Sequence, residues 1–281
     1  MLARRWTLVA AALACAGAVP SRPAADGARE LVWSDEFDGP AGARVDSLTW
    51  RHDTADGCAA GICGWGNNEK QYYTSAAENV ALDGRGHLVI TARQAPPGLA
   101  CYYGPCRYTS AKITTRGTLA LPPGSRVEAR IKLPAGQGLW PAFWMLGAGY
   151  PETPWPACGE LDVMEYRGST PTATSSAVHG PGYSGNTPFA HRHTLQHGRF
   201  ADEFHIFAVE WDSLIARFYV DGAPHYTVSR GELERSGRSI LHQPFFMILN
   251  LAVGGHFDGD PASDAILPAS LVIDYVRVFR R

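Results

Sequence analysis

Short apolar runs, broken by glycine, proline, asparagine and aspartate, follow one another along most of the chain. Several of them alternate apolar and polar residues, and this period of two is that of a half-buried β-strand. The clearest runs span residues 87–91, 126–132, 206–211, 216–220 and 271–279. Only residues 230–235 predict a turn or two of helix. The pattern predicts an all-β fold, a β-sandwich or a barrel. Two curved antiparallel sheets would leave one concave face free for a chain-like ligand.

The first residues differ from the rest of the chain. Arg4 and Arg5 precede an apolar run that ends at Val19, and this run is shorter than the roughly 20 residues that a membrane span needs. Small residues at positions 14, 16 and 18 suit signal-peptide cleavage. We therefore predict a signal peptide over residues 1–18, a linker over 19–30, and one folded domain over 31–281. The protein is expected to be secreted. A lipoprotein anchor at Cys15 is the alternative, although the residues before it are a poor lipidation signal.

Composition narrows the class of partner. The chain has 281 residues, a length that one β-sandwich domain can occupy. Its formal net charge is −2, so it lacks the basic field that nucleic acid or an anionic membrane requires. We expect a neutral or weakly charged partner and a monomeric protein. Tryptophan and tyrosine are abundant, and their rings fill cores but also make flat platforms for sugar rings.

Six cysteines in an exported chain indicate disulfide bonds. Cys58 and Cys63 are five residues apart, as are Cys101 and Cys106, and a local bridge within each pair is the simplest arrangement. Crossed pairing between the two loops stays open, because spacing alone does not settle connectivity. Metal ligation is the rival interpretation, but no C-x-x-C spacing supports it. Cys158 is left over, and we expect it to be buried and unpaired.

Three carboxylates lie close together in one apolar run, at Glu160, Asp162 and Glu165. Side chains alternate faces along a strand, so Glu160 and Asp162 point the same way. A bulge of one residue around Val163 and Met164 would bring Glu165 to the same face. Three like charges in a row repel one another, so we expect at least one of them to hold a proton near neutral pH.

Such a row suits glycoside hydrolysis with retention of configuration. One carboxylate attacks the anomeric carbon, and a protonated partner about 5–5.5 Å away delivers a proton to the leaving oxygen. Asp162 would lie between the two and tune them. A solvated acidic edge strand and a Ca²⁺ site are the alternative interpretations. No H-E-x-x-H zinc motif occurs, and His191 and His193 are expected in a solvated loop.

The E-x-D-x-x-E pattern of residues 160–165 resembles the active-site strand of family 16 of the glycoside hydrolases, in the bulged form of laminarinases, agarases and carrageenases. Four further segments are similar to that family, at residues 31–37, 65–73, 138–145 and 178–185. The resemblance covers nearly all of the chain after the predicted linker. It implies a jelly-roll, concanavalin-like sandwich, with the catalytic domain over residues 31–281. The segment 178–185 is most similar to the β-1,3-glucanase branch.

The resemblance implies a role for each matching position. Glu160 matches the nucleophile, Asp162 the assisting carboxylate and Glu165 the general acid/base. The residues implied in substrate binding are Asn67, Glu69, Trp140, Trp144, His179 and Asn250. Three of these also have structural interpretations: Trp144 as a core ring, His179 as a hydrogen-bonded histidine, and Asn250 as a buried amide that needs a partner.

A structural calcium ion is a further implication of the resemblance. Its ligands would be the main chain of Glu36 and Gly86, together with Asp274. No cofactor is expected for catalysis. One segment departs from the family: residues 256–259 read His-Phe-Asp-Gly where Asn-Trp-Pro-Gly is common, so a sugar-stacking tryptophan is missing or replaced by Phe257.

These observations together predict a secreted, retaining endo-β-glucanase that acts on laminarin-type β-1,3-glucan. Mixed β-1,3-1,4-glucan is the expected second substrate. Two alternatives remain: the same mechanism on a galactan, as in agarases and carrageenases, or a glucan-recognition protein that binds without cutting. The negative net charge disfavours a sulfated galactan, and the presence of both glutamates disfavours a protein without activity.

Overall fold

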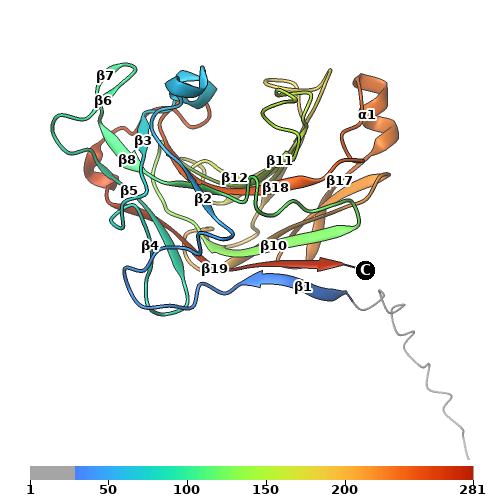
Figure 1. Cartoon of the computed structure of the whole chain (residues 1–281), viewed down its shortest axis with the longest axis horizontal. Coiled ribbons are helices and arrows are strands. Elements are labelled where there is room, and N and C mark those ends of the chain that lie inside the picture. Colours follow the sequence, from blue (N-terminus) through green and yellow to red (C-terminus); the bar gives the residue numbers. More distant parts are fainter. Residues whose placement is uncertain (1–28, 281) are drawn as a thin grey trace, which may run out of the picture.

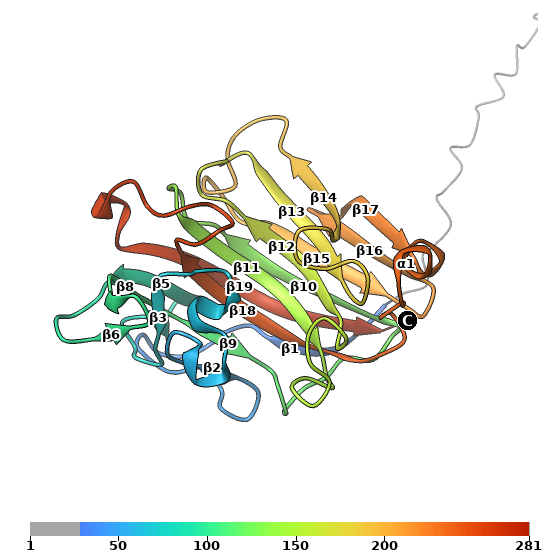
Figure 2. The same cartoon turned by 90° about the horizontal axis from the view of Figure 1, so that it is seen from above.

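The computed structural model describes residues 29–280, which fold into two large β-sheets that form a sandwich (Figure 1, Figure 2). The smaller sheet has seven strands in the order β14-β13-β12-β11-β18-β9-β2, and all its neighbours are antiparallel. Its strands are β2 (Arg51–Asp53), β9 (Lys112–Thr114), β11 (Leu139–Gly147), β12 (Glu160–Tyr166), β13 (Ala173–His179), β14 (Phe189–Thr194) and β18 (Phe245–Val253).

The larger sheet has ten strands, eight of them in the order β17-β16-β15-β10-β19-β5-β8-β3, while β1 pairs with β19 and β4 with β5. Its strands are β1 (Glu30–Asp35), β3 (Gln71–Tyr73), β4 (Val80–Leu82), β5 (Leu88–Gln94), β8 (Tyr108–Ser110), β10 (Ser125–Lys132), β15 (His205–Trp211), β16 (Ile215–Val220), β17 (Ala223–Ser229) and β19 (Ala269–Arg280). The pair β3–β8 is parallel. The sandwich prediction is confirmed, with this pair as an addition.

Small elements connect the sheets. Strands β6 (Ala100–Cys101) and β7 (Gly104–Pro105) form a separate hairpin. The helical pieces are α1 (Arg230–Ser236) and three 3₁₀ turns, η1 (Cys58–Ala60), η2 (Cys63–Gly66) and η3 (Asp264–Ile266). All five runs that predicted strands fall in strands, and the predicted helical turn is α1, which begins with a capping box between Ser229 and Glu232.

The core lies between the two sheets and follows the alternation seen in the sequence. Along β10 every second residue is buried, and its inward side chains Val127, Ala129 and Ile131 belong to the main hydrophobic cluster. Strand β18 is buried along its whole length, because its outer face is covered as well. There, Phe246 and Cys158 contribute to a second, smaller cluster beneath the β11–β12 loop.

The outer face of the seven-stranded sheet lies between raised loops. In Figure 1 the segments that carry η1, η2, β6 and β7 rise at one side of this face, and loops beside α1 rise at the other. Strands β11, β12 and β18 run through the middle of the sheet, as Figure 2 shows from above. Along the middle of this face β18 is covered, while Trp140 and Trp144 of β11 and Glu160 and Glu165 of β12 are partly exposed.

The prediction for His191 and His193 is wrong, because both lie on strand β14 and not in a loop. This strand is at the edge of the seven-stranded sheet and is largely exposed. An edge strand with few apolar residues does not show the alternation that identifies a half-buried strand. The polar composition therefore concealed it.

Some predictions concern residues outside the described range. The signal peptide over residues 1–18, Cys15 and nearly all of the linker over 19–30 lie there. Strand β1 begins at Glu30, the last residue of that linker. Among residues 29–280, no helix has the length and apolar character needed to cross a membrane.

Candidate active site

Strand β12 carries the three carboxylates on the outer face of the seven-stranded sheet. Asp162 pairs with Ala177 of β13, while Glu165 pairs with Ser175, so two residues of β12 between these pairs oppose one of β13. The same extra residue breaks the register with β11. The predicted bulge is thus confirmed. Because of it, Glu160, Asp162 and Glu165 share one face.

The opposite face of β12 explains how the strand holds three carboxylates together although they repel one another. Leu161, Val163, Met164 and Tyr166 are at most 1% exposed and lie in the main core. Burying a large apolar side chain contributes about 1.5–3 kcal/mol, so several such side chains hold the strand against carboxylate repulsion. Strand β11 ends at Gly147, close to the residues that precede β12. A Cβ on Gly147 would lie 1.8 Å from the carbonyl oxygen of Cys158. Glycine therefore permits the close approach from which Glu160 begins.

Burial and mutual repulsion raise the pKa of all three carboxyl groups. Burial, followed by the charge of Asp162, raises the pKa of Glu160 to about 8. Burial, followed by the charge of Glu160, raises the pKa of Glu165 to about 7. The pKa of Asp162 lies well above its usual value, through burial and the charge of Glu165. The row therefore holds protons at neutral pH, as the repulsion argument predicts, and it shares them among its members.

Hydrogen bonds distinguish the two glutamates. Trp155 Nε1 donates to Glu160 Oε2 over 2.8 Å, and Trp140 Nε1 donates to Glu165 Oε1 over 3.2 Å. Both bonds favour the ionised carboxylate, and the shorter one is on Glu160. His179 pairs with Glu160 across β12 and β13, and its Nε2 lies 3.8 Å from Glu160 Oε1. Its predicted place beside the carboxylate row is confirmed.

Trp155 was not identified in the sequence. It lies in the β11–β12 loop, and 43% of its surface is exposed although it is a large apolar side chain. The same loop contains Cys158, which is buried in the small outer cluster and has a free thiol, as predicted. Burial of Cys158 anchors the loop that presents Trp155. A tryptophan five residues before a candidate nucleophile, in a proline-rich loop, was the available signal.

Four polar side chains form a chain beneath the face. Trp144 Nε1 donates to Asn250 Oδ1 over 2.7 Å, and Asn250 Nδ2 donates to the hydroxyl oxygen of Tyr73 over 3.1 Å. The Tyr73 hydroxyl lies 3.4 Å from Glu69 Oε2. Asn250 and Glu69 are each 6% exposed, so the structure supplies both with partners from the protein. Their predicted part in substrate binding stays a prediction.

Asn67 and Glu69 lie together after η2. Asn67 is exposed, and its Nδ2 donates to Glu69 Oε1 over 3.2 Å. Gln71 donates to the other carboxylate oxygen over 2.6 Å. Burial raises the pKa of Glu69 in spite of these bonds. Of the two, Asn67 is the residue placed to contact a ligand directly.

Lys112 is a buried cation that sequence analysis missed. It lies on β9, 7% exposed, with Nζ 4.2 Å from the ring centre of Trp65 and 5.0 Å from that of Trp144. Asp53 Oδ2 lies 3.7 Å from Nζ. Burial lowers the pKa of Lys112, while Asp53 acts in the opposite direction. Lys112 therefore joins two indole rings by cation–π contacts, and only the tertiary structure brings them together.

Phe257 takes a place beside Trp140. The two rings stack with centres 4.6 Å apart, and the guanidinium of Arg167 lies 4.2 Å from the centre of Phe257. Asp258 fixes the segment by accepting hydrogen bonds from Gly138 N and Ser169 N. The aromatic ring that replaces the family's tryptophan thus covers one side of Trp140, next to Glu165.

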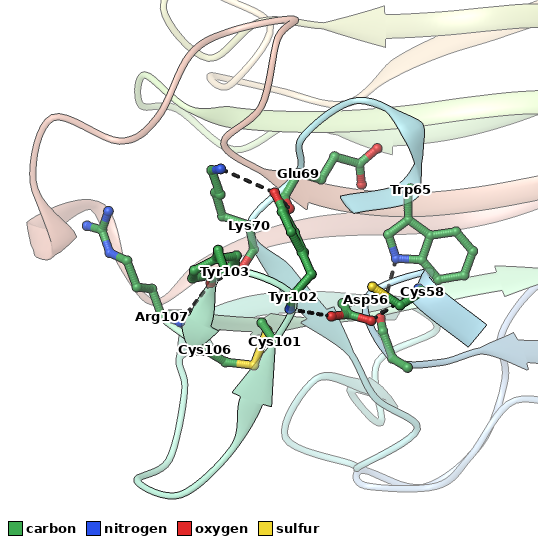
Figure 3. Close-up of a disulfide and its surroundings, with 11 residues drawn as sticks. Asp56, Cys58, Trp65, Glu69, Lys70, Cys101, Tyr102, Tyr103, Cys106 and Arg107 are labelled. Atoms are coloured by element: carbon green, nitrogen blue, oxygen red, sulfur yellow. Dashed lines mark hydrogen bonds between the residues drawn. A yellow bond between two sulfur atoms is a disulfide. The ribbon is translucent and has the colours of Figure 1, made fainter. Parts of the chain in front are cut away.

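Both local disulfides are confirmed, one between Cys58 and Cys63 and one between Cys101 and Cys106. Figure 3 shows the Cys101–Cys106 bridge beneath Tyr102, with Asp56, Cys58 and Glu69 nearby. Asp56 joins the two loops, since its carboxylate accepts from Tyr102 N over 2.7 Å and from Cys58 N over 3.2 Å.

Two of the residues predicted to hold calcium, Glu36 and Gly86, lie together, and His87, next to Gly86, has its Nε2 3.9 Å from Asp274 Oδ1. A Cβ on Gly86 would lie 3.7 Å from Asp38 Oδ1 and 4.0 Å from the main-chain oxygen of Glu36. This oxygen-lined space fits a hard cation. Asp274 is less free, because its Oδ2 accepts from Arg130 over 2.6 Å.

Comparison with known proteins agrees with this geometry. A β-glucanase of Rhodothermus marinus is 38% identical over 262 residues, which span 89% of this chain and 85% of that protein. The laminarinase catalytic domain of Thermotoga maritima superposes with a TM-score of 0.84 and 41% identity, over 90% of this chain and 98% of that one. The endo-β-1,3-glucanase of Pyrococcus furiosus gives 0.83 and 41%, over 90% and 94%. The model of the glycosyl hydrolases family 16 matches residues 67–277, and the chain therefore belongs to this family.

Proposed function

We propose that this protein is a retaining endo-β-1,3-glucanase in which Glu160 is the nucleophile and Glu165 the general acid/base. The bulge in β12 carries the proposal, because it puts both glutamates and Asp162 on the solvent-facing side of the sheet. Laminarin-type β-1,3-glucan is the proposed substrate, supported by the similarity to laminarinases. Mixed β-1,3-1,4-glucan is the proposed second substrate.

In the first step the ionised Glu160 attacks the anomeric carbon while Glu165 gives its proton to the glycosidic oxygen. A pKa of about 7 suits Glu165 for donating a proton near neutral pH. The hydrogen bond from Trp155 and the nearby His179 only partly offset burial, and the pKa of Glu160, about 8, stays above that of Glu165. The assignment of Glu160 as nucleophile therefore rests on its match to the family's active-site strand and not on the order of the two pKa values. In the second step Glu165 takes a proton from water, which hydrolyses the glycosyl-enzyme.

The aromatic rings of the face provide the binding surface. Trp155 exposes its ring beside Glu160, and Trp140 stacks on Phe257 beside Glu165. Sugar rings pack against such rings through their apolar faces. Asn67 and His179 are the polar residues we propose for direct contact, whereas Asn250 and Glu69 hold Trp144 and the floor of the site.

A product profile tests the proposed function. The chain without residues 1–18 is incubated with laminarin, barley mixed-linkage glucan, agarose and κ-carrageenan, and the released oligosaccharides are separated. Short products from laminarin, with equal or weaker release from barley glucan, are expected. Products only from a galactan would keep the mechanism and change the substrate. Binding without products would support a glucan-recognition protein.

We also propose a structural calcium ion held by the main chain of Glu36 and Gly86 and by Asp274. The oxygen-lined space at Gly86 supports it. A ligand that binds only the folded state stabilises it by about 2.7 kcal/mol at 100 times its dissociation constant. Chelation with EGTA should therefore lower Tm by several degrees, and added calcium should restore it. An unchanged Tm, with no calcium found by elemental analysis, would contradict the proposal.

Secretion is proposed from the sequence of the first 18 residues. Expression of the full chain in a secreting host should give an extracellular protein that begins at or near residue 19. N-terminal sequencing checks this. An intact N-terminus, or a lipid on Cys15, would rule out the proposed processing.

A further inference from the structure

Three ligand-type side chains converge at one end of the carboxylate row. Within residues 29–280, Glu160, Asp162 and His179 are the one trio of histidine, cysteine or acidic residues whose candidate ligand atoms all lie within 4.8 Å of one another. His179 Nε2 lies 3.2 Å from Asp162 Oδ2 and 3.8 Å from Glu160 Oε1. The backbone fixes this arrangement, since Glu160 and His179 are paired residues of β12 and β13.

These separations match the edge of a tetrahedral metal site. Zinc binds nitrogen and oxygen ligands at about 2.0–2.2 Å, which places neighbouring tetrahedral ligands about 3.4 Å apart. The two observed separations lie on either side of that value. The third pair, Glu160 and Asp162, lies within 4.8 Å, so modest side-chain shifts would bring the three groups around one ion.

Asp162 provides an independent indication of a ligand. It is 3% exposed, and its Oδ2 accepts no hydrogen bond although it faces His179 Nε2. A buried acceptor without a donor costs about 1–3 kcal/mol, and a cation at this point would remove that cost. A divalent ion would also reduce the repulsion among the three carboxylates.

We propose that the substrate-free active site binds one divalent transition-metal ion, Zn²⁺ or Cu²⁺, through Glu160, Asp162 and His179, and that this ion inhibits the enzyme reversibly. The mixed nitrogen and oxygen donors favour such ions over Mg²⁺, which prefers oxygen ligands in an octahedron. His179 Nδ1 is buried without a hydrogen-bond partner, so no second group orients the imidazole as in high-affinity sites. We therefore expect the site to hold the ion weakly enough for a chelator to empty it.

Binding does not depend on the proposed function, whereas inhibition rests on it, because the ion occupies the proposed nucleophile. The two are measured separately. Calorimetry with zinc sulfate at constant neutral pH should show one site in the chain without residues 1–18, and magnesium sulfate should give no heat at the same concentrations. Laminarin hydrolysis in calcium-saturated EDTA, which captures zinc but leaves the proposed calcium site filled, tests the proposed function without a transition metal. Zinc at ten times its dissociation constant should then raise KM about tenfold with kcat unchanged, and EDTA should reverse this.

His191 and His193 on the edge strand β14 provide the matched control. His179→Gln removes one ligand of the proposed site, and we expect zinc affinity to fall by about tenfold or more. The double variant His191→Ala/His193→Ala removes two histidines that lie outside the site and should leave both zinc affinity and activity unchanged. Loss of binding in the double variant, with binding retained in His179→Gln, would overturn the proposal.

A second variant covers the case in which His179→Gln does not fold, as judged by circular dichroism. Asp162→Asn keeps the shape of the side chain and removes a charged ligand, so it should weaken zinc binding to a similar degree. Laminari-oligosaccharide should displace zinc from the unaltered protein. No zinc heat with the unaltered protein, or zinc binding that saturating oligosaccharide leaves unchanged, would also overturn the proposal.

Discussion

Two regions of the molecule concentrate ionisable side chains, and they do so for different physical ends. The carboxylate row of β12 lies in the middle of the seven-stranded sheet and faces solvent. The second region is the histidine cluster, formed by His191, His193 and His225. It lies where β14 and β17, the edge strands of the two sheets, meet. There the ring of His225 lies 5.8 Å from that of His191 and 5.2 Å from that of His193.

The partners of the buried groups differ in the two regions. Glu160 receives a hydrogen bond from Trp155 and faces His179, so its charged form is supported although burial raises its pKa. The hydrogen-bond partner of His225 Nε2 is the Ser176 hydroxyl, at 3.2 Å, and within residues 29–280 its buried Nδ1 has none. Burial, followed by the charges of the other histidines, lowers the pKa of His225 to about 4. The first region places carboxyl groups with raised pKa values where they can exchange protons with a substrate, and the second packs His225 as a neutral imidazole.

Removal of either glutamate should have the largest effect. Glu165→Gln should lower kcat on laminarin by about 10²–10⁴-fold because general acid catalysis is lost. Glu160→Gln should lower it further, since no covalent intermediate forms. Stability should stay the same or rise, because one member of a repelling row becomes neutral. Steady-state kinetics and circular dichroism check both. A folded variant with unchanged activity would contradict the assigned roles, and His225→Gln, assayed alongside, should retain activity.

Removal of the hydrogen bond from Trp155 to Glu160 should have the next largest effect on kcat. Trp155→Phe keeps an aromatic ring and removes the donor to Glu160. A hydrogen bond to a charged group is worth about 1.5–3 kcal/mol, and solvent near this exposed side chain replaces part of it. We therefore expect kcat to fall about tenfold, with a smaller change in KM. Wild-type kcat in this variant would show that Trp155 does not support the charge on Glu160.

Acid should destabilise the histidine cluster, chiefly through His225. Since the pKa of His225 is lowered to about 4, the unfolded chain binds a proton first as pH falls below about 6.5. Stability contributed by neutral His225 is complete above that pH and is lost between pH 6.5 and 4. Partial exposure reduces the effect to about 1–2 kcal/mol. Urea unfolding at several pH values should show a flatter dependence for His225→Gln, and identical slopes would contradict this.

The smallest expected effect concerns the reactivity of the Cys158 thiol, because the part of this residue is to anchor a loop. Without residues 1–18, the folded protein should show no reactive thiol, and after unfolding without reductant it should show one, as measured with a thiol reagent. The two disulfides account for the other four cysteines of that chain. Any other number of thiols in the unfolded protein would contradict this pairing.

Local physics made much of the molecule predictable. The five clearest strand patterns, the helical turn and both disulfides follow from neighbours in the chain. The bulge at Val163 and Met164 was also predictable, because the apolar and acidic residues of β12 satisfy opposite faces only if one residue is extra. Strand β14 was not, since an exposed edge strand carries no alternation. Lys112 was missed because the rings that it contacts, Trp65 and Trp144, are brought to it only by the fold. Trp155 is only five residues from Glu160, but its contact depends on how the intervening loop turns back.

The sequence by itself determined the fold class, the three carboxylates on one face and the identity of the family, since each depends on residue types at short and regular spacing. The tertiary structure alone decided which donors reach those carboxylates and which polar residues are already satisfied. Asn250 is an example, because strands far apart in the chain supply its partners Trp144 and Tyr73. Hydrogen bonds and pKa shifts depend on distance and burial, and these exist only after the sheets have packed.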